Sequence, residues 1–324
     1  MTRQPTDIRK ATNTRLGAVF FLLLLLFCLA LLLRRADVAA SCMREGLALC
    51  ARAVVPSLFP FMVLSELLVT SGTGEWLTAP LSRPLGKLLG LSRAGCCALV
   101  LGLVCGFPTG ARSALVSYEK GALTRAECER VLACSSIPSS AFLISTVGTT
   151  LWKDAAFGVA LYLSSVFSAL LGGFLLYVLQ KKDKRQMQQA FSSPCAKVHF
   201  EAEMFSSAIK KATMNILLIC AYVIFFSTLA GAAQLVLDRF FANEAAHAIL
   251  ASFLELSGGA SAAAELSNPR FAKMLTGAAV GWSGLSIHCQ MLSLCDGHDL
   301  STRPYLVGKI VQAVTCATIM TIVK

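Results

Sequence analysis

Residues 95–118 read GCCALVLGLVCGFPTGARSALVSY, and the pattern of this stretch decides the fold. The run at 95–105 is apolar but has only 11 residues, whereas a helix needs about 20 to cross a membrane. A second short apolar run, 111–118, follows the turn GFPTG at 106–110. Two half-length helices joined by a Gly/Pro turn predict a re-entrant hairpin. Its tip then lies near the middle of the membrane, where irregular backbone must be buried in protein or line a cavity.

The composition of the whole chain favours a membrane protein. Apolar residues make up 56% of the 324 residues and charged residues 15%, against about 25% charged in a soluble domain. Lipid must therefore cover most of the surface. The net charge is 29 − 18 = +11, and the basic residues lie in short gaps between apolar runs, as the positive-inside rule predicts. We therefore expect the lipid bilayer, and no nucleic acid, as the partner of these charges.

The sequence carries no signature of an enzyme or of a metal site. It contains no HExxH, Walker A, GxSxG or paired-carboxylate motif. The 13 cysteines lie mostly inside apolar segments, without a CxxC pair or a Cys/His cluster, so we interpret them as small packing residues. We expect no catalytic residue, no cofactor and no metal.

The other apolar runs of the first half predict further spans. The first, 16–33, is interpreted as an uncleaved span, with a cleaved signal peptide as the alternative because small residues follow it. The second, 46–70, contains two prolines and is expected to be bent. The run 131–152 is interrupted by SSIPSS at 135–140, which indicates an unwound helix, and 155–179 is a conventional span.

A basic stretch at 181–211 separates the two halves and marks the cytoplasmic side. After it the same order returns: the span 212–237, the run 245–266 broken by SGGAS at 257–261, the run 271–295 broken by GWSGLS at 281–286, and the closing span 305–323. We therefore expect two repeats, residues 46–180 and 212–324, after an N-terminal segment at 1–45. Tracing the crossings from an inner N-terminus puts the two hairpins on opposite faces. The repeats are then inverted, as in many secondary transporters.

Three motifs carry a resemblance to a known family. They are PSLFPF at 56–61 with SELL at 65–68, GFPTGA at 106–111, and WSGLSIHCQ at 282–290. In this order they resemble the YlbJ-type sporulation integral membrane proteins, which carry paired nucleoside-recognition (Gate) domains. The chain departs from the family at 135–138, where members often have an Asn pair, and at Trp282, where Phe is usual. The resemblance implies an all-α fold related to concentrative nucleoside transporters, and a role in sporulation.

The broken-helix tips are the predicted substrate site. Half-helices that end inside a membrane present unpaired N–H groups, which can bind an anionic carboxylate or phosphate. Small hydroxyl residues can instead serve close helix packing, but their clustering beside breaks in both halves favours a site. The predicted substrate-binding residues are Gly106, Pro108, Thr109, Gly110, Arg112, Ser135, Ser136, Ser139, Ser257, Gly258, Ser283, Gly284, Ser286 and Gln290.

Three ionisable side chains near these breaks are expected to be functional, because charge inside a membrane is costly. Glu255 is a candidate to take up a coupling proton or cation, or else to bind exposed hairpin backbone. His288 is a candidate proton relay, or else satisfies a backbone carbonyl. Arg112 pairs with an anionic substrate or a Glu, or else extends to the membrane surface.

These expectations predict a multi-pass protein of a bacterial cell membrane, in the mother cell or the forespore, that works as a secondary transporter. The expected substrate is a small anionic metabolite, dipicolinate or nucleoside-like, moved with a proton or a sodium ion. The alternative is a non-transporting membrane scaffold or sensor for spore-envelope assembly. A homo-oligomer is compatible with the sequence. The sequence leaves open the substrate, the coupling ion, the direction of transport and the oligomeric state.

Overall fold

The chain folds into helices throughout the residues that the structure describes. The computed structural model describes residues 32–180, 200–238 and 243–323, together with Leu22, Leu25, Leu26 and 28–30. Within them, four helices are long and apolar enough to cross a membrane: Ala36–Thr70, Ala155–Leu179, Ala202–Gln234 and Arg303–Ile322. The prediction of an all-α, multi-pass membrane protein is confirmed. Most of the predicted span 16–33 lies outside the described residues.

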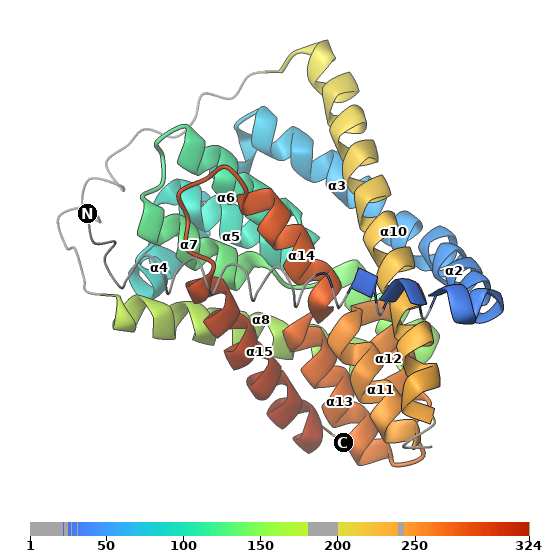
Figure 1. Ribbon diagram of the computed structural model, residues 1–324. Helices are drawn as coiled ribbons and strands as arrows, with labels where there is room; N and C mark the ends of the chain where they lie inside the picture. Colours follow the sequence, from blue (N-terminus) through green and yellow to red (C-terminus); the bar gives the residue numbers. More distant parts are fainter. Residues whose placement is uncertain are drawn as a thin grey trace, which may run out of the picture.

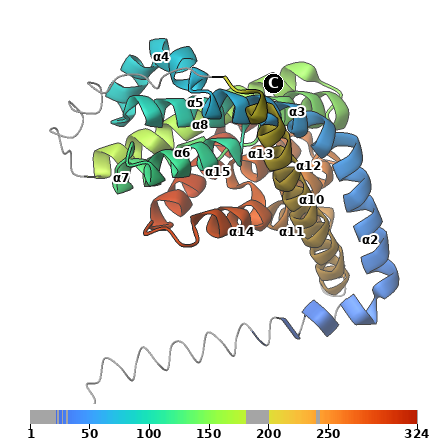
Figure 2. The same ribbon diagram turned by 90° about the horizontal axis from the view of Figure 1, so that it is seen from above.

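The first described crossing is a continuous helix of three parts. α2 (Ala36–Leu49) runs into a π-helical turn, η1 (Cys50–Val54), and then into α3 (Val55–Thr70). The π turn lies directly before Pro56, whose missing N–H forces the hydrogen-bond ladder to readjust. The long helix α10 (Ala202–Asp238) packs along this crossing through a buried apolar cluster (Figure 2).

α4 (Thr73–Leu89) precedes the first hairpin and meets α5 (Arg93–Cys105) at an angle of 100°. It exposes the large apolar side chains Trp76, Leu77 and Leu81, while small residues face the protein. A helix with an exposed apolar face is typical of the membrane interface, where such side chains enter the headgroup layer.

The predicted hairpin in the first half is formed by α5 and α6 (Thr109–Glu119), joined by 106–108 (Figure 1). The two helices pack closely because Gly102 and Gly110 meet near the turn. A methyl group on Gly110 would lie 2.5 Å from the Cα atom of Gly102, a distance that real side chains do not tolerate. The two glycines therefore set how near the helices approach.

The unwound helix of the first half follows this hairpin. α7 (Arg125–Ser135) ends, residues 136–139 are extended or turned, and the π-helical segment η2 (Phe142–Leu151) continues. This confirms the break predicted at SSIPSS. The next helix, α8 (Ala155–Leu179), has the bounds that the sequence predicts.

The second half also contains a long helix, a hairpin, a broken helix and a closing helix, while α4 of the first half has no counterpart among the described residues. α11 (Glu244–Leu254) and α12 (Leu256–Ala264) form a hairpin, α13 (Pro269–Trp282) and α14 (Gly284–Cys295) are the parts of a broken helix, and α15 (Arg303–Ile322) closes the chain. The break predicted within 281–286 is confirmed, at Ser283. The predicted start of the preceding span at 212 is wrong, because α10 begins at Ala202 and 202–211 is helix rather than loop.

The break predicted at 257–261 is also wrong. The chain turns at Glu255, whose extended backbone ends α11 and whose side chain accepts a hydrogen bond from the first turn of α12. Residues 257–261 are therefore helical. Their small side chains serve the contact between α11 and α12, where a methyl group on Gly259 would lie 2.3 Å from the Ser252 Cα. Close helix packing and an unwound backbone use the same residue types.

In each half the hairpin tip packs against that half's own broken helix. In the first half the Phe107 N–H donates to the carbonyl of Ile137 at 2.8 Å. In the second half the Trp282 Nε1–H donates to the carbonyl of Phe253 at 3.1 Å. Backbone groups released by one break are thus satisfied by the other, as a lipid environment requires.

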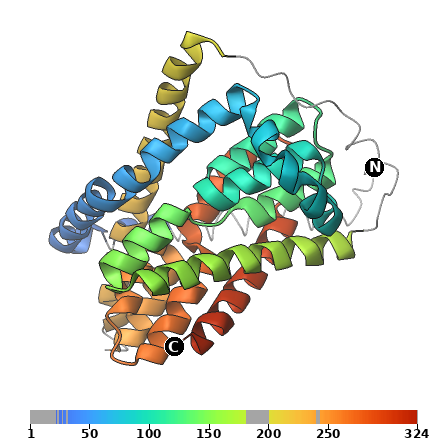
Figure 3. The ribbon, with the colours of Figure 1, turned by 180° about the vertical axis from the view of Figure 1, so that it is seen from behind.

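α8 and α15 pack against each other and cross at an angle (Figure 3). α13 also packs along α15, and the contact is close because Gly277 and Gly281 face its backbone. α15 therefore contacts both broken helices, α7 on one side and α13 on the other. The centre of the fold is this meeting of α7, α13 and α15.

Two adjacent glycines in α12 allow the hairpin contact to be tested. We expect Gly259→Ala to destabilise the protein by about 1–3 kcal/mol, because the added methyl overpacks the Ser252 backbone. Gly258→Ala should be neutral or slightly stabilising, because the nearest atom lies 3.5 Å away and Ala favours helix. Thermal unfolding of both variants in detergent measures the difference. Equal effects would contradict the assignment of Gly259 to the hairpin contact.

Candidate functional site

A cavity lies where the two hairpin tips and the two broken helices meet. Phe107 reaches it from the first tip, Pro138 from the first break, Leu256 from the second tip and Ile287 from α14. Its water-accessible volume is about 60 Å³, which is enough for several water molecules at about 10–15 Å³ each. η1, α3 and α10 complete its wall with four apolar side chains, Val54, Leu58, Ile219 and Val223.

The polar edge of the cavity consists of five predicted site residues: Ser139, Glu255, Ser257, Ser286 and Gln290. All five are largely buried. The Gln290 amide Nε2 donates to Ser286 Oγ at 3.4 Å, and Ser139 Oγ accepts from the Phe142 N–H at 3.2 Å. The cavity thus combines an apolar wall with a short row of hydrogen-bonding groups.

Glu255 lies at the second hairpin tip and is 3% exposed. Its Oε2 accepts a hydrogen bond of 2.7 Å from the Gly258 N–H, at the amino end of α12. This contact caps the helix and fixes the carboxyl group at the cavity. Both readings of the sequence, a capping group and a candidate coupling group, are compatible with this position.

The amino end of α14 also lies at the cavity. The helix begins after Ser283, which has left-handed backbone angles and whose side chain does not cap it. Ser286 and Ile287, in the first turn, line the cavity. Uncapped N–H groups at a helix start carry partial positive charge and favour an anion.

Other predicted residues support the site from outside the cavity. Ser135 packs between Gly102 and Gly110, and Gly106 packs against Ser139. Arg112 donates to the side-chain oxygen of Asn215 on α10. The remaining residues, Pro108, Thr109, Gly258 and Gly284, belong to the turns or to the first residues of helices next to the cavity.

Lys309, on α15, was not among the predicted site residues, yet it joins the two breaks. It has 0% exposure, and its ammonium Nζ donates to the Ser136 carbonyl at 2.7 Å and to Ser283 Oγ at 2.7 Å. A third acceptor, Gln312 Oε1, lies 3.1 Å away. The signal in the sequence is that Lys309 is the single charged residue in 305–323.

His288 is buried in the second broken helix and lies between two aromatic rings. Its Nδ1 is 2.8 Å from the Tyr305 hydroxyl, and its ring centroid is 4.2 Å from that of Trp282. Its Nε2 has no hydrogen-bond partner among the described residues. Its partner is thus a hydroxyl on α15 rather than a backbone carbonyl.

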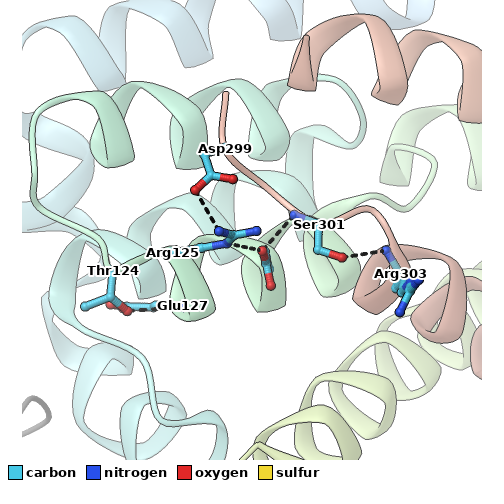
Figure 4. Close-up of polar contacts among 7 residues, drawn as sticks. Thr124, Arg125, Glu127, Asp299, Ser301 and Arg303 are labelled. Atoms are coloured by element: carbon cyan, nitrogen blue, oxygen red, sulfur yellow. Dashed lines mark hydrogen bonds and ion pairs between the residues drawn. The ribbon is translucent and has the colours of Figure 1, made fainter. Parts of the chain in front are cut away.

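Polar contacts connect the start of α7 with the loop before α15 (Figure 4). Arg125 forms ion pairs with Glu129 at 3.0 Å and with Asp299 at 2.7 Å, and Glu129 also accepts from the Ser301 N–H at 2.7 Å. The Arg125 and Asp299 side chains are exposed, so their pair adds little to stability. The contacts do place these two segments at the same end of the molecule.

The fold and the cavity define this chain as an integral, multi-pass membrane protein with paired broken helices. The chain is 22% identical over 338 aligned positions to the sporulation integral membrane protein YlbJ of Bacillus subtilis (strain 168). The alignment covers 94% of this chain and 81% of that protein, so the chain is homologous to a Bacillus sporulation membrane protein. The sequence matches no family model, and no solved structure matches it. The assignment of Gate domains stays a prediction.

Proposed function

We propose that this protein is a secondary transporter that moves a small polar metabolite across the membrane during sporulation. The observation that carries the proposal is the cavity, which is lined from both hairpin tips and both broken helices and takes its polar groups from the second tip and the two broken helices. Cavities between discontinuous helices of two repeats are where secondary transporters bind their substrates. The sporulation setting rests on the distant homology to the Bacillus protein.

Contacts at the two ends of the molecule support an inverted arrangement of the halves. The first hairpin finishes at Glu119, which accepts from His298 in the loop before α15 at 2.8 Å. The second hairpin finishes near Leu266, which belongs to the apolar cluster against which Trp152 packs. The broken helix of α13 and α14 runs from the end near Leu266 to the end near His298. If this helix crosses the membrane, as we propose, the two hairpins start from opposite faces.

The chemistry of the cavity favours a flat, partly apolar substrate with a polar or anionic edge. The apolar wall and Phe107 and Phe142 suit the faces of an aromatic ring, while Gln290 and the serines suit polar substituents. The amino end of α14 attracts negative charge. Dipicolinate and the base of a nucleoside are both flat rings with polar edges, and dipicolinate is anionic whereas a nucleoside is neutral.

Glu255 is the proposed carrier of a coupling proton. An ionised carboxylate would repel an anionic substrate in the same cavity, whereas a protonated one can donate a hydrogen bond to it. Binding of the anion and of a proton to Glu255 would therefore be linked. Transport would be driven by a proton gradient.

The cavity is tested by filling it. We expect Ser286→Leu, which adds an apolar side chain to the lining, to reduce uptake into proteoliposomes by about tenfold or more, or 1.4 kcal/mol. Ser293→Leu is the matched control, because Ser293 is exposed on the same helix. Labelled dipicolinate and uridine are the substrates to compare. Folded wild-type protein that takes up neither would favour the scaffold or sensor role instead.

Coupling is tested at Glu255. Glu255→Gln keeps the shape of the side chain but cannot exchange a proton. We expect this variant to retain substrate exchange across the membrane and to lose accumulation driven by a pH gradient. Uptake that still follows the pH gradient in this variant would rule out Glu255 as the proton carrier.

A further inference from the structure

Lys309 places an ionisable amine in the interior of a membrane-spanning helix. It has 0% exposure and lies within the α15 span. An ionisable group in this environment is costly unless its charge and its hydrogen bonds are satisfied. The surroundings of Lys309 therefore have to compensate it.

The ammonium group has three N–H donors and three oxygen acceptors around it. They are the Ser136 carbonyl, Ser283 Oγ and Gln312 Oε1, at 2.7, 2.7 and 3.1 Å. The acceptors are held in place by bonds of their own: Ser283 Oγ donates to the Val280 carbonyl at 3.0 Å, and Gln312 Nε2 donates to the Ala133 carbonyl at 2.8 Å. Each hydrogen bond recorded for Nζ among the described residues is thus to an oxygen, and two of the three oxygens belong to side chains with a further bond of their own.

Two half-helices direct their carboxyl ends at the same ammonium group. Ser136 follows the last residue of α7, and Ser283 follows the last residue of α13. The carboxyl end of a helix carries partial negative charge and favours a cation. No ion pair recorded among the described residues includes Lys309, so dipoles rather than a carboxylate compensate its charge.

Such a set of ligands is what a bound metal cation would need. In secondary transporters, carbonyls of unwound backbone and the carboxyl ends of half-helices coordinate the coupling sodium ion. Here a side chain of the protein supplies the positive charge.

We propose that Lys309 is a resident cation that fills a cation site between the ends of α7 and α13, so the protein needs no sodium ion at this position. The comparison with a coupling sodium ion rests on the proposed transport function. The contacts of Lys309 themselves do not depend on it. The ammonium group bonds to Ser136 in the first half and to Ser283 in the second. It therefore joins the halves as a shared metal ion would.

Two substitutions of Lys309 distinguish the effect of losing its charge from the effect of leaving its space empty. Lys309→Met removes the charge but keeps an apolar stem in the space, whereas Lys309→Ala removes both. We expect both variants to unfold several degrees below the wild-type protein, because each leaves oriented oxygens without a donor. We further expect sodium chloride or propylammonium chloride, compared with choline chloride, to stabilise Lys309→Ala in a saturable manner.

Three control samples show whether the cation response is specific to the space that Lys309 leaves. Lys309→Met should not respond to sodium or propylammonium, because its side chain occupies the space. Lys273→Ala, at a half-buried lysine of α13 whose Nζ contacts the Val323 carbonyl at 3.3 Å, should show no cation response either. The wild-type protein should have the same unfolding temperature in sodium and in choline.

Two results would overturn the proposal. One is a saturable stabilisation of the wild-type protein by sodium that Ser283→Ala abolishes, which would place a free sodium ion at this position. The second is wild-type stability in both Lys309 variants. If Lys309→Ala cannot be purified, the wild-type comparison and Lys309→Met still decide. Absence of transport activity in any of these samples would bear on the proposed function and leave this stability test unaffected.

Discussion

The hydrogen bonds of Lys309 and Gln312 hold the two broken helices together at the centre of the fold. Each break releases carbonyl groups that lipid cannot satisfy. Lys309 Nζ satisfies the carbonyl of Ser136, Gln312 Nε2 satisfies that of Ala133, and Ser283 Oγ bonds to the same ammonium group. α15 therefore supplies hydrogen bonds to both unwound segments. These bonds explain why the final helix lies against both halves.

The cavity follows from this arrangement. With α7 and α13 fixed at their carboxyl ends, the unwound residues after α7 and the start of α14 are held beside the two hairpin tips. Each tip is in turn bonded to its own broken helix, Phe107 to Ile137 and Trp282 to Phe253. Four irregular segments thus meet around one small space, and polar groups of the second tip and of both broken helices form its edge. An opening of the cavity to either face would have to move a hairpin without breaking the Lys309 contacts.

The sequence predicts much of this fold because Gly, Pro and Ser interrupt the long apolar runs at turns and helix breaks. The turn at 106–108, the break after Ser135 and the helix α8 were all readable from that pattern. The SGGAS run at 257–261 was misread, since small residues that let two helices touch look the same in sequence as residues of an unwound helix. The turn lies at Glu255, where a capping carboxylate rather than glycine ends one helix and starts the next. Lys309 is not among the predicted site residues because the apolar run around it is typical of a plain span, although a lone charge within such a run indicates a functional role.

The central claim is that the two halves face each other in inverted orientation around one cavity. Single cysteines at four exposed positions at or near helix ends, Lys120, Asp296, Lys153 and Arg270, test it when labelled with a membrane-impermeant thiol reagent in a background without reactive native cysteines. The proposal predicts that positions 120 and 296 label from the cytoplasmic side, and that 153 and 270 label only from the opposite side. Labelling of all four positions from one side would contradict it.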